Sequence, residues 1–380
     1  MDSKKYNNIK LAIGIIKGIF SFILILLFVL TGLSLNLQNY LGRFFSNSYL
    51  LFILFVGVTG IAAGIIFFPV NYYTEFHLEH KYNLSNQTFW KWIWEDLKSL
   101  FVSLVIGIPI LLLFFYSLNK FLSLWLLPFA IILFVISVIL ARIVPIFILP
   151  LFYKITPLEN EELKNRIQKL ASDAGIKVEN VFKFNMSKNT KKANAAFTGI
   201  GKSKRILLGD TLLDNYTEDE IETVIAHELG HYKRKHIIKN IFIGTASSFL
   251  MLFLIAYFYG ISISWFGFSS IIQIAALPLL SLWAMIIGLV LTPLTNILSR
   301  KFEYEADEYA IASTKKKDAF ITTLEKLTDQ NLGDKEPHPF VEWFFYSHPS
   351  IKNRVAAINN FASKNDGSQS VNDQLKFEGS

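Results

Sequence analysis

The chain has 380 residues, of which 52% are hydrophobic and only 18% are charged, and its mean hydropathy is +0.39. A soluble globular domain typically has about 25% charged residues, so this composition excludes an ordinary soluble protein. The sequence contains no cysteine, which excludes disulfides and thiolate metal sites and leaves His, Asp and Glu to hold any metal.

Six segments carry little or no charge over the roughly 20 residues that a helix needs to cross a bilayer core. They lie at about 11–33, 49–70, 100–118, 123–148, 238–260 and 270–297. One such segment could be a buried helix of a soluble core, but six in one chain predict a mainly α, polytopic helical bundle in a membrane. The first is longer than the apolar region of a cleavable signal peptide, and no small-residue cleavage site follows it.

The basic residues alternate from loop to loop and predict an orientation. Lysines precede the first span, and Lys and Arg are again frequent in 71–98, in 154–236 and after residue 299, whereas the intervening loops hold few. We therefore expect both termini and both large polar segments on the cytosolic side. The net charge of +7 follows from this bias, because no basic helix interleaved with exposed aromatic residues indicates nucleic-acid binding.

The pattern divides the chain into five parts. These are an N-terminal membrane domain of four spans at 1–153 with an interfacial loop at 71–98, an α+β unit at 154–236, a two-span hairpin at 237–299, a helical segment at 300–361 and a polar tail at 362–380. The α+β unit begins with an amphipathic helix at 161–174. Its strands are expected at 181–185, 193–199 and 205–209, with Lys202-Ser203-Lys204 as the turn between the last two.

The α+β unit ends in the motif His227-Glu228-Leu229-Gly230-His231, on a helix that Thr217 is placed to cap. Histidines four residues apart share one face of a helix, so both imidazoles can reach one zinc ion, and Glu228 then lies beside the metal as a general base. The alternative interpretation is a chance pair of histidines on a helix surface. The motif therefore predicts that this unit is the platform of a zinc site.

A catalytic zinc needs a third protein ligand and one open position. The spacing typical of metzincins would place a histidine at Ile237, and no Asp, Glu or His occurs from 237 through 302. The next candidates are Glu303, Glu305, Asp307 and Glu308. Glu303 and Asp307 share a helical face, so one could bind zinc while the other orients a ligand histidine, whereas Glu305 points roughly the opposite way. A solvated acidic helix face is the alternative.

The ligand-free interval is the hairpin of spans five and six. It leaves one membrane surface and returns to it, which brings the two ligand helices together there. We therefore expect the zinc at the cytosolic membrane boundary.

Several motifs together resemble a known family. The zinc motif and the segment Glu303-Tyr304-Glu305-Ala306-Asp307 are similar to those of the integral-membrane zinc proteases that include the type I CAAX prenyl protease. Further similar segments are FPVNYYTEF at 68–76, KYNLSNQT at 81–88, LPLFYKITPL at 149–158, NAAF at 194–197, RILLGDTLL at 205–213 and FYSHPS at 345–350. The resemblance implies a membrane bundle that carries a gluzincin-type metalloprotease unit and cleaves peptides near their C-terminus.

The resemblance also implies a role for each site residue. One zinc ion per chain would be held by His227, His231 and Glu303, while Glu228 activates water and Asp307 supports a ligand histidine. The remaining roles would fall to His348 and Arg354, which stabilise the oxyanion, and to Asn194, Ala195, Ala196 and Phe197, which hold an extended peptide by β-augmentation. The implied partners are a peptide or protein substrate, prenylated at its C-terminus in the family, and the lipid bilayer, without nucleic acid.

The chain departs from the family pattern in three places. We expect it to have one N-terminal span fewer than is usual in eukaryotic members. Tyr232 stands where Trp is usual, and Ala196 stands where a Tyr is usual beside the substrate Asn. The abundance of Ile, Lys, Phe and Asn is typical of an AT-rich genome, and we expect a bacterial plasma membrane rather than the endoplasmic reticulum. His236 has no assigned role, and a structural one is favoured.

Two other functions remain open from the sequence. One is a quality-control zinc protease of the related heat-shock type, although those proteins are usually shorter before the zinc helix. The other is a membrane scaffold or transporter that only keeps a metal. The intact Glu228 argues against the scaffold, because a structural site needs ligands but no base.

Overall fold

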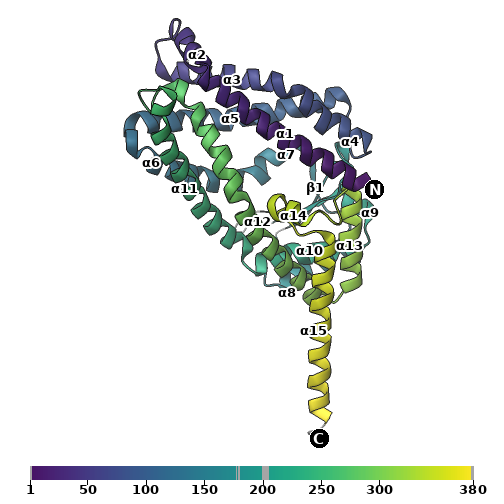
Figure 1. Ribbon diagram of the computed structural model, residues 1–380. Coiled ribbons are helices and arrows are strands. Elements are labelled where there is room, and N and C mark those ends of the chain that lie inside the picture. The colour runs from purple at the N-terminus through teal and green to yellow at the C-terminus, as the bar shows by residue number, and fades with distance from the viewer. Residues whose placement is uncertain (1, 177, 179, 199–204, 378–380) are drawn as a thin grey trace.

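A computed structural model describes residues 2–176, 178, 180–198 and 205–377 (Figure 1). The N-terminal half consists of α1 (Asp2–Leu30), α2 (Leu33–Gly42), α3 (Ser48–Asn71), a π-helical segment (Tyr72–His77), α4 (Leu78–Lys81), α5 (Phe89–Phe121), α6 (Leu126–Ile143), a second π-helical segment (Val144–Ile148) and α7 (Leu149–Phe152). The C-terminal half consists of β1 (Ile155–Pro157), α8 (Glu161–Asp173), β2 (Asn180–Phe184), β3 (Ala195–Thr198), β4 (Arg205–Gly209), α9 (Asp210–Asn215), α10 (Glu218–Lys233), α11 (His236–Ser262), α12 (Pro278–Thr314), α13 (Lys317–Gln330), α14 (Pro339–Phe345) and α15 (Ile351–Phe377).

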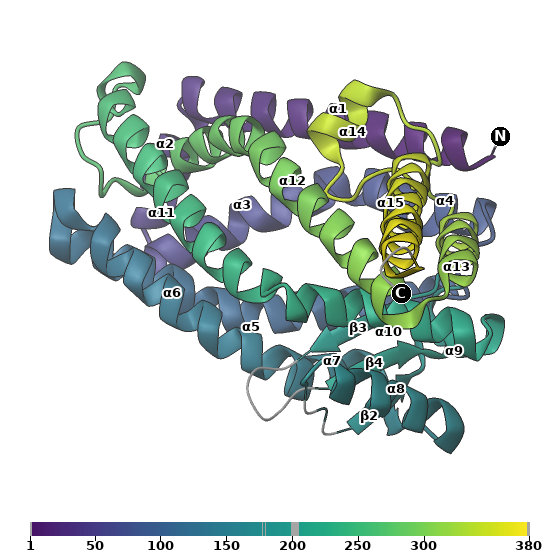
Figure 2. The same cartoon turned by 90° about the horizontal axis from the view of Figure 1, so that it is seen from below.

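The six predicted spans are confirmed as helices that are long and apolar enough to cross a membrane, in the part of the chain that the structure describes. They are Asp2–Leu30, Ser48–Lys81, Phe89–Leu124, Leu126–Phe152, His236–Ser262 and Ile274–Thr314. Only 0–11% of the most apolar window is buried in the first five, against 39% in the sixth. Most side chains of the first five spans are therefore at least partly exposed, as expected for helices that contact lipid, while a buried apolar cluster that includes Phe52, Phe115 and Tyr259 joins the spans. Figure 2 shows α1 along one side of the bundle and α6 along the other.

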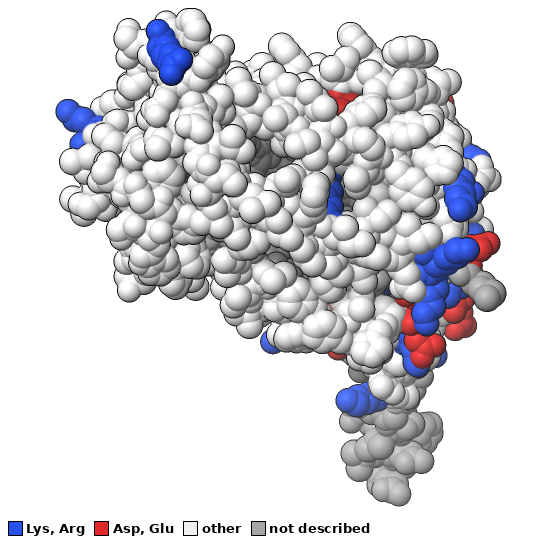
Figure 3. Space-filling view, turned by 45° about the horizontal axis from the view of Figure 1, so that its top comes forward, with Lys and Arg blue, Asp and Glu red and all other residues white. Residues whose placement is uncertain are grey.

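The distribution of charged side chains is uneven. On the face shown in Figure 3 they are sparse over the helical bundle and cluster beside the base of α15. This distribution is what a bilayer requires, because a charged side chain at membrane depth is costly unless it is paired or faces water.

The interval 71–98, expected to be a loop, is mostly helical. The helix of the second span continues through the π-helical segment Tyr72–His77 to Lys81, and α5 begins at Phe89. Thr88 caps α5 by accepting a hydrogen bond from the amide of Lys91 at 3.4 Å. The polar residues of this interval are thus helical extensions of two apolar spans, and only the short connection between Lys81 and Phe89 is irregular. α15 likewise continues to Phe377, into the predicted polar tail.

The α+β unit contains a four-stranded sheet among the described residues, in the order β1-β2-β4-β3. β2 is parallel to β4, while β1 and β3 are antiparallel to their neighbours. The predicted pairing of β3 with β4 is present, with Ala195 opposite Leu208, and the predicted turn at 202–204 lies outside the described residues. β3 therefore forms one edge of this sheet and β1 the other.

The zinc-motif helix, α10, has a strong start signal and a buried face. Thr217 caps it as predicted, because its hydroxyl accepts from the amide of Glu220 and the Glu220 carboxylate accepts from the amide of Thr217 in return. Ile225 and Leu229 are fully buried in the apolar core of the α+β unit, which also includes Ile167 and Phe320. This core fixes which face of α10 is left for the two histidines.

The sixth span and the acidic motif form one helix. α12 runs unbroken for 37 residues from Pro278 to Thr314, so the membrane segment and the segment that begins at residue 300 are a single rigid element. α12 crosses α10 closely at Gly230. A Cβ atom added there would come within 3.0 Å of the Ala306 Cα and 3.1 Å of the Ala306 carbonyl oxygen.

We expect Gly230→Val to separate α10 from α12 and to lower thermal stability by about 1–3 kcal/mol, because the added methyl groups meet backbone that cannot yield. Thermal unfolding in detergent measures the effect. Gly244→Val is the matched control, since a Cβ at Gly244 on the exposed face of α11 meets nothing within 4 Å. Equal stability of the two variants would contradict a tight crossing at Gly230.

Candidate metal centre

α10 presents both motif histidines to one point. His227 and His231 lie one turn apart, and their Nε2 atoms are 3.1 Å from each other. Two ring nitrogens this close need either a shared proton or a cation between them, because both cannot direct lone pairs at each other without repulsion. The helix therefore fixes two nitrogen donors at the distance that one ion would bridge.

Glu303 on α12 completes a group of three donors. Its carboxylate oxygens lie 3.5 Å from the Nε2 of His227 and 3.3 Å from the Nε2 of His231. A tetrahedral zinc ion with bonds of about 2.0 Å places neighbouring ligand atoms about 3.3 Å apart. The three separations match that edge length, and two imidazoles with one carboxylate suit zinc. The residues present thus fit the metal that the sequence motif predicts.

Asp307 and Arg354 hold His227 from behind. The Nδ1 of His227 lies 2.8 Å from Asp307, and the Nε of Arg354 donates to the same carboxylate at 2.9 Å. With its Nδ1 engaged, the ring directs Nε2 toward the ligand group. Burial disfavours the charged form of His227, but hydrogen bonds with Asp307 and Glu303 outweigh burial and raise the pKa of His227 to about 9. The same negative field that favours a proton here favours a metal cation.

His236 and Glu305 hold His231 in a parallel way, which the sequence reasoning missed. The Nδ1 atoms of His231 and His236 are 3.1 Å apart, and the Nε2 of His236 lies 2.9 Å from Glu305. His236 is 1% exposed, and its ring stacks on Phe302 with centroids 4.3 Å apart. A carboxylate of α12 thus supports each motif histidine, Asp307 by direct contact with His227 and Glu305 through His236 for His231.

Glu305 was predicted to point away from Glu303. That prediction did not include the contact of Glu305 with His236. α11 begins at His236, and that start brings the His236 ring beside α12. The spacing of His231 and His236 was the available signal, but their contact depends on the turn at Lys235, whose φ is +59°.

Glu228 lies between the two histidines on α10 and is half-buried. Among the described residues, its carboxylate makes no hydrogen bond or ion pair, in contrast to Glu303 and Asp307. A carboxylate that is free of partners and beside the donor group is available to accept a proton. This arrangement is compatible with the predicted general base.

His348, in the connection between α14 and α15, and Arg354, on α15, both reach Glu303. The Nε2 of His348 lies 3.5 Å from one Glu303 oxygen, and an Arg354 nitrogen lies 3.9 Å from the other. His348 is largely exposed, with 65% of its side chain accessible, whereas Arg354 is mostly buried against Asp307. The structure thus brings both residues to the donor group, and Arg354 is the more firmly engaged.

The predicted peptide-binding segment lies beside the zinc-motif helix. The ring of Phe197 in β3 is 5.6 Å from the ring of Tyr232, the residue that follows His231. Asn194, immediately before β3, is exposed, and Ala195 and Ala196 are half-buried. An extended chain along this edge strand would therefore pass close to the donor group.

We expect Asp307→Asn to weaken zinc binding by about 10- to 100-fold, because the change removes the charge that orients His227. Competition with a chelator of known affinity measures the zinc dissociation constant. Asp214→Asn is the matched control, since Asp214 is exposed on α9. Unchanged zinc affinity in the Asp307 variant would show that this carboxylate does not orient the ligand.

Comparisons with known proteins cover both halves of the chain. The model of peptidase family M48 matches residues 157–362, and the model described as "CAAX prenyl protease N-terminal, five membrane helices" matches residues 1–154. The described part of this chain has four candidate spans in the second range, together with the short helix α2. The family that the sequence motifs resemble is thereby confirmed.

Individual relatives are similar along most of their length. CAAX prenyl protease 1 of Saccharomyces cerevisiae is 33% identical over 328 residues, which cover 82% of this chain and 72% of the yeast protein. An uncharacterized metalloprotease of Bacillus subtilis, YhfN, is 31% identical over 93% of this chain and 84% of its own. The crystal structure of S. mikatae Ste24p has a TM-score of 0.84 at 30% identity, over 94% of this chain and 88% of that chain.

The predicted fold class, a membrane helical bundle with a small α+β metalloprotease unit, is confirmed by this structural similarity. Because the M48 model spans more than half of the chain, the protein belongs to peptidase family M48, whose members are zinc-dependent, and it is a multi-pass membrane metalloendopeptidase.

Proposed function

We propose that this protease cleaves peptides and proteins near their C-terminus at the membrane surface, and that its substrates carry a prenyl group on a CAAX-type end. One zinc ion per chain would be held by His227, His231 and Glu303. The observation that carries the proposal is the group of three donor atoms together with Glu228, which has no partner within the described ranges, in a chain similar over both halves to proteins named CAAX prenyl protease.

The chemistry divides among the residues around the donor group. Zinc bound there would supply a Lewis acid that polarises the scissile carbonyl and makes water a stronger acid. Glu228 takes the proton from the attacking water and returns it to the amine of the departing peptide. His348 and Arg354 face the oxygen of the tetrahedral intermediate, and the exposure of His348 leaves its ring free to approach the substrate.

The proposed location is the cytosolic boundary of a bacterial plasma membrane. The alternation of basic loops supports the cytosolic side. The similarity to YhfN over 93% of this chain supports a bacterial setting. The division of the chain at 153, 236, 299 and 361 stays a proposal, and the continuous helix α12 joins two of its parts.

The comparisons do not favour the quality-control alternative. The match of the CAAX-type N-terminal model to residues 1–154 supports the CAAX-type function, because this region precedes the zinc-motif helix. A scaffold that only keeps a metal would need neither Glu228 nor a peptide-binding edge strand beside it.

We expect Glu228→Gln to lower kcat by about a thousandfold, because the amide cannot accept the proton of water, while zinc stays bound. Peptide turnover and metal content are measured on the same preparation. Glu325→Gln, an exposed change on α13, is the matched control and should leave both unchanged. Equal turnover by wild type and the Glu228 variant would exclude Glu228 as the base.

We expect a farnesylated CAAX peptide to be cleaved with a kcat/KM about tenfold or more above that of the same peptide without the lipid, because apolar contact with the spans adds binding free energy. The two peptides are compared in one detergent. Cleavage of unfolded membrane proteins without cleavage of either peptide would contradict the proposed substrate and favour the quality-control function.

A further inference from the structure

The main-chain groups of β3 alternate between two directions. The carbonyl of Asn194 accepts a hydrogen bond from the amide of Gly209 at 3.0 Å, so the peptide groups of Asn194 face β4. In an antiparallel pair, successive residues direct their N–H and C=O groups to opposite sides. Ala193, Ala195 and Phe197 therefore direct theirs outward, toward the open edge of the sheet.

This edge is already occupied at Ala193. The amide of Ala193 donates to the Oδ1 of Asn331 at 2.9 Å, and the Nδ2 of Asn331 donates back to the Ala193 carbonyl at 3.2 Å. A side-chain amide has the same donor and acceptor as a peptide group, so Asn331 occupies the place of a neighbouring strand residue. Among the described residues, the edge is open at Ala195 and Phe197 and closed at Ala193.

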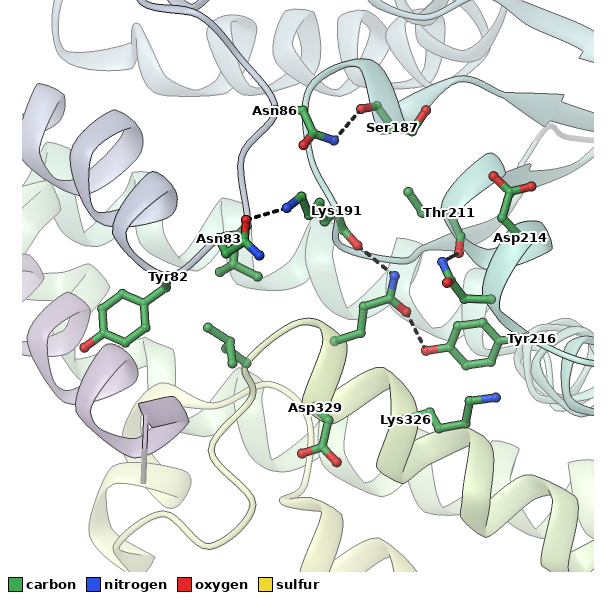
Figure 4. A pocket seen from close by; sticks show the side chains of 14 residues that line it. Tyr82, Asn83, Asn86, Ser187, Lys191, Thr211, Asp214, Tyr216, Lys326 and Asp329 are labelled. Atoms are coloured by element: carbon green, nitrogen blue, oxygen red, sulfur yellow. Dashed lines mark hydrogen bonds between the residues drawn. The ribbon is translucent and has the colours of Figure 1, made fainter.

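Other contacts occupy the chain before Ala193. The carbonyl of Lys191 accepts from the side chain of Gln330 at 2.7 Å, and Thr190 pairs with Ser85 as an isolated β-bridge. Figure 4 shows the polar pocket on this side, of about 830 Å³, with Lys191 directed toward Asn83. A peptide that is paired with β3 therefore cannot continue its ladder past Ala193.

The surroundings of Asn331 hold it in place. The next residue, Leu332, has a φ of +51°, a left-handed conformation that a leucine keeps only when its neighbours require it. Leu332 packs against Tyr6, Leu78 and Leu84, and its carbonyl accepts from the side chain of Asn7 at 2.6 Å. The turn that carries Asn331 is thus fixed by α1 and by the second span.

We propose that Asn331 limits how many residues a substrate can carry beyond the cleaved bond. The proposal rests on the proposed function, in which cleavage falls near a C-terminus. The body of such a substrate needs an open end of the groove, and its short tail can lie against a closed one. The closed end is at Ala193, so the peptide runs antiparallel to β3 with its C-terminus toward Asn331.

The dimensions fit a short tail. Ala193 and Ala195 are two residues apart, about 7 Å in an extended chain. Phe197 lies beside Tyr232 and hence beside the zinc-motif helix, so the cleaved bond lies on the Phe197 side of Ala195. Only a few residues then fit between that bond and the Asn331 side chain.

The test measures kcat/KM for two peptides that differ only in the length of the tail after the cleaved bond, about three and about five residues. Wild type is expected to prefer the short tail. Asn331→Ala is expected to raise the ratio of long-tail to short-tail cleavage about tenfold, because the alanine leaves the Ala193 groups free to pair with the longer peptide.

Asn331→Asp is the second variant. It keeps the acceptor for the Ala193 amide and loses the donor to the Ala193 carbonyl. Its ratio of long-tail to short-tail cleavage should therefore lie between those of wild type and the alanine variant. It replaces the alanine variant in the test if that variant does not fold. Asn215→Ala is the matched control, because Asn215 is an exposed amide on the pocket wall whose side chain, in the part of the chain that the structure describes, bonds only to the Thr211 carbonyl of its own helix. Its ratio should equal that of wild type.

An unchanged ratio in a folded Asn331 variant would overturn the proposal, and so would an equal rise in the Asn215 control. A loss of stability alone would lower both rates together and leave their ratio as it is. Failure of the proposed substrate is a separate result, since farnesylated peptides would then not be preferred while the tail-length ratio could still be read from unmodified peptides.

Discussion

The crossing of α10 and α12 is the contact on which the rest of the site depends. Two donors stand on one helix and the third on the other, so their separation is set by how closely the helix backbones approach. Gly230 permits that approach, since its missing Cβ leaves room for the backbone of Ala306. The capping box at Thr217 fixes where α10 starts, and the buried residues Ile225 and Leu229 fix its rotation. The donor geometry is therefore a result of packing.

The crossing also buries two carboxylates, which are stable in the interior only when positive charges compensate them. Glu303 and Asp307 are 6% and 2% exposed, and buried carboxylates are strongly unfavourable unless they are paired. Arg354 compensates Asp307, and a divalent cation would compensate Glu303. Of the two motif histidines, His227 contacts Asp307 directly and His231 is linked to Glu305 through His236. Electrostatics and geometry thus favour the same occupant at the same point.

The sequence was informative where local rules decide the structure. The spans follow from bilayer thickness, and the two histidines follow from helical periodicity. The absence of nearer donors and the return of the hairpin pointed to the helix that carries Glu303 and Asp307, and the family resemblance implied Glu303 as the ligand. The first two inferences need only spacing along the chain, which is why the predicted spans are helices and the two histidines share one face of α10 in the structure.

What the sequence did not reveal depends on contacts between distant segments. His236 contacts His231 because the chain turns at Lys235. Lys235 has a left-handed backbone conformation although it is not a glycine, so the residue type does not indicate the turn. Asn331 and Ala193 are 138 residues apart, and no periodicity relates them. The interval 71–98, predicted as a loop, is mostly helical because the helices of two apolar spans continue into polar sequence. Hydropathy alone places the end of a helix where the apolar residues end. Tertiary packing set these features.

The unbroken helix α12 restricts where related chains can accept insertions and deletions. Each residue of an α-helix turns the chain by about 100° and advances it by about 1.5 Å. One residue inserted between the span and Glu303 would therefore carry the carboxylate around the helix axis and away from both histidines. Loops on the surface can absorb insertions and deletions, but this segment cannot. Among related chains, the length of this segment should vary far less than its composition.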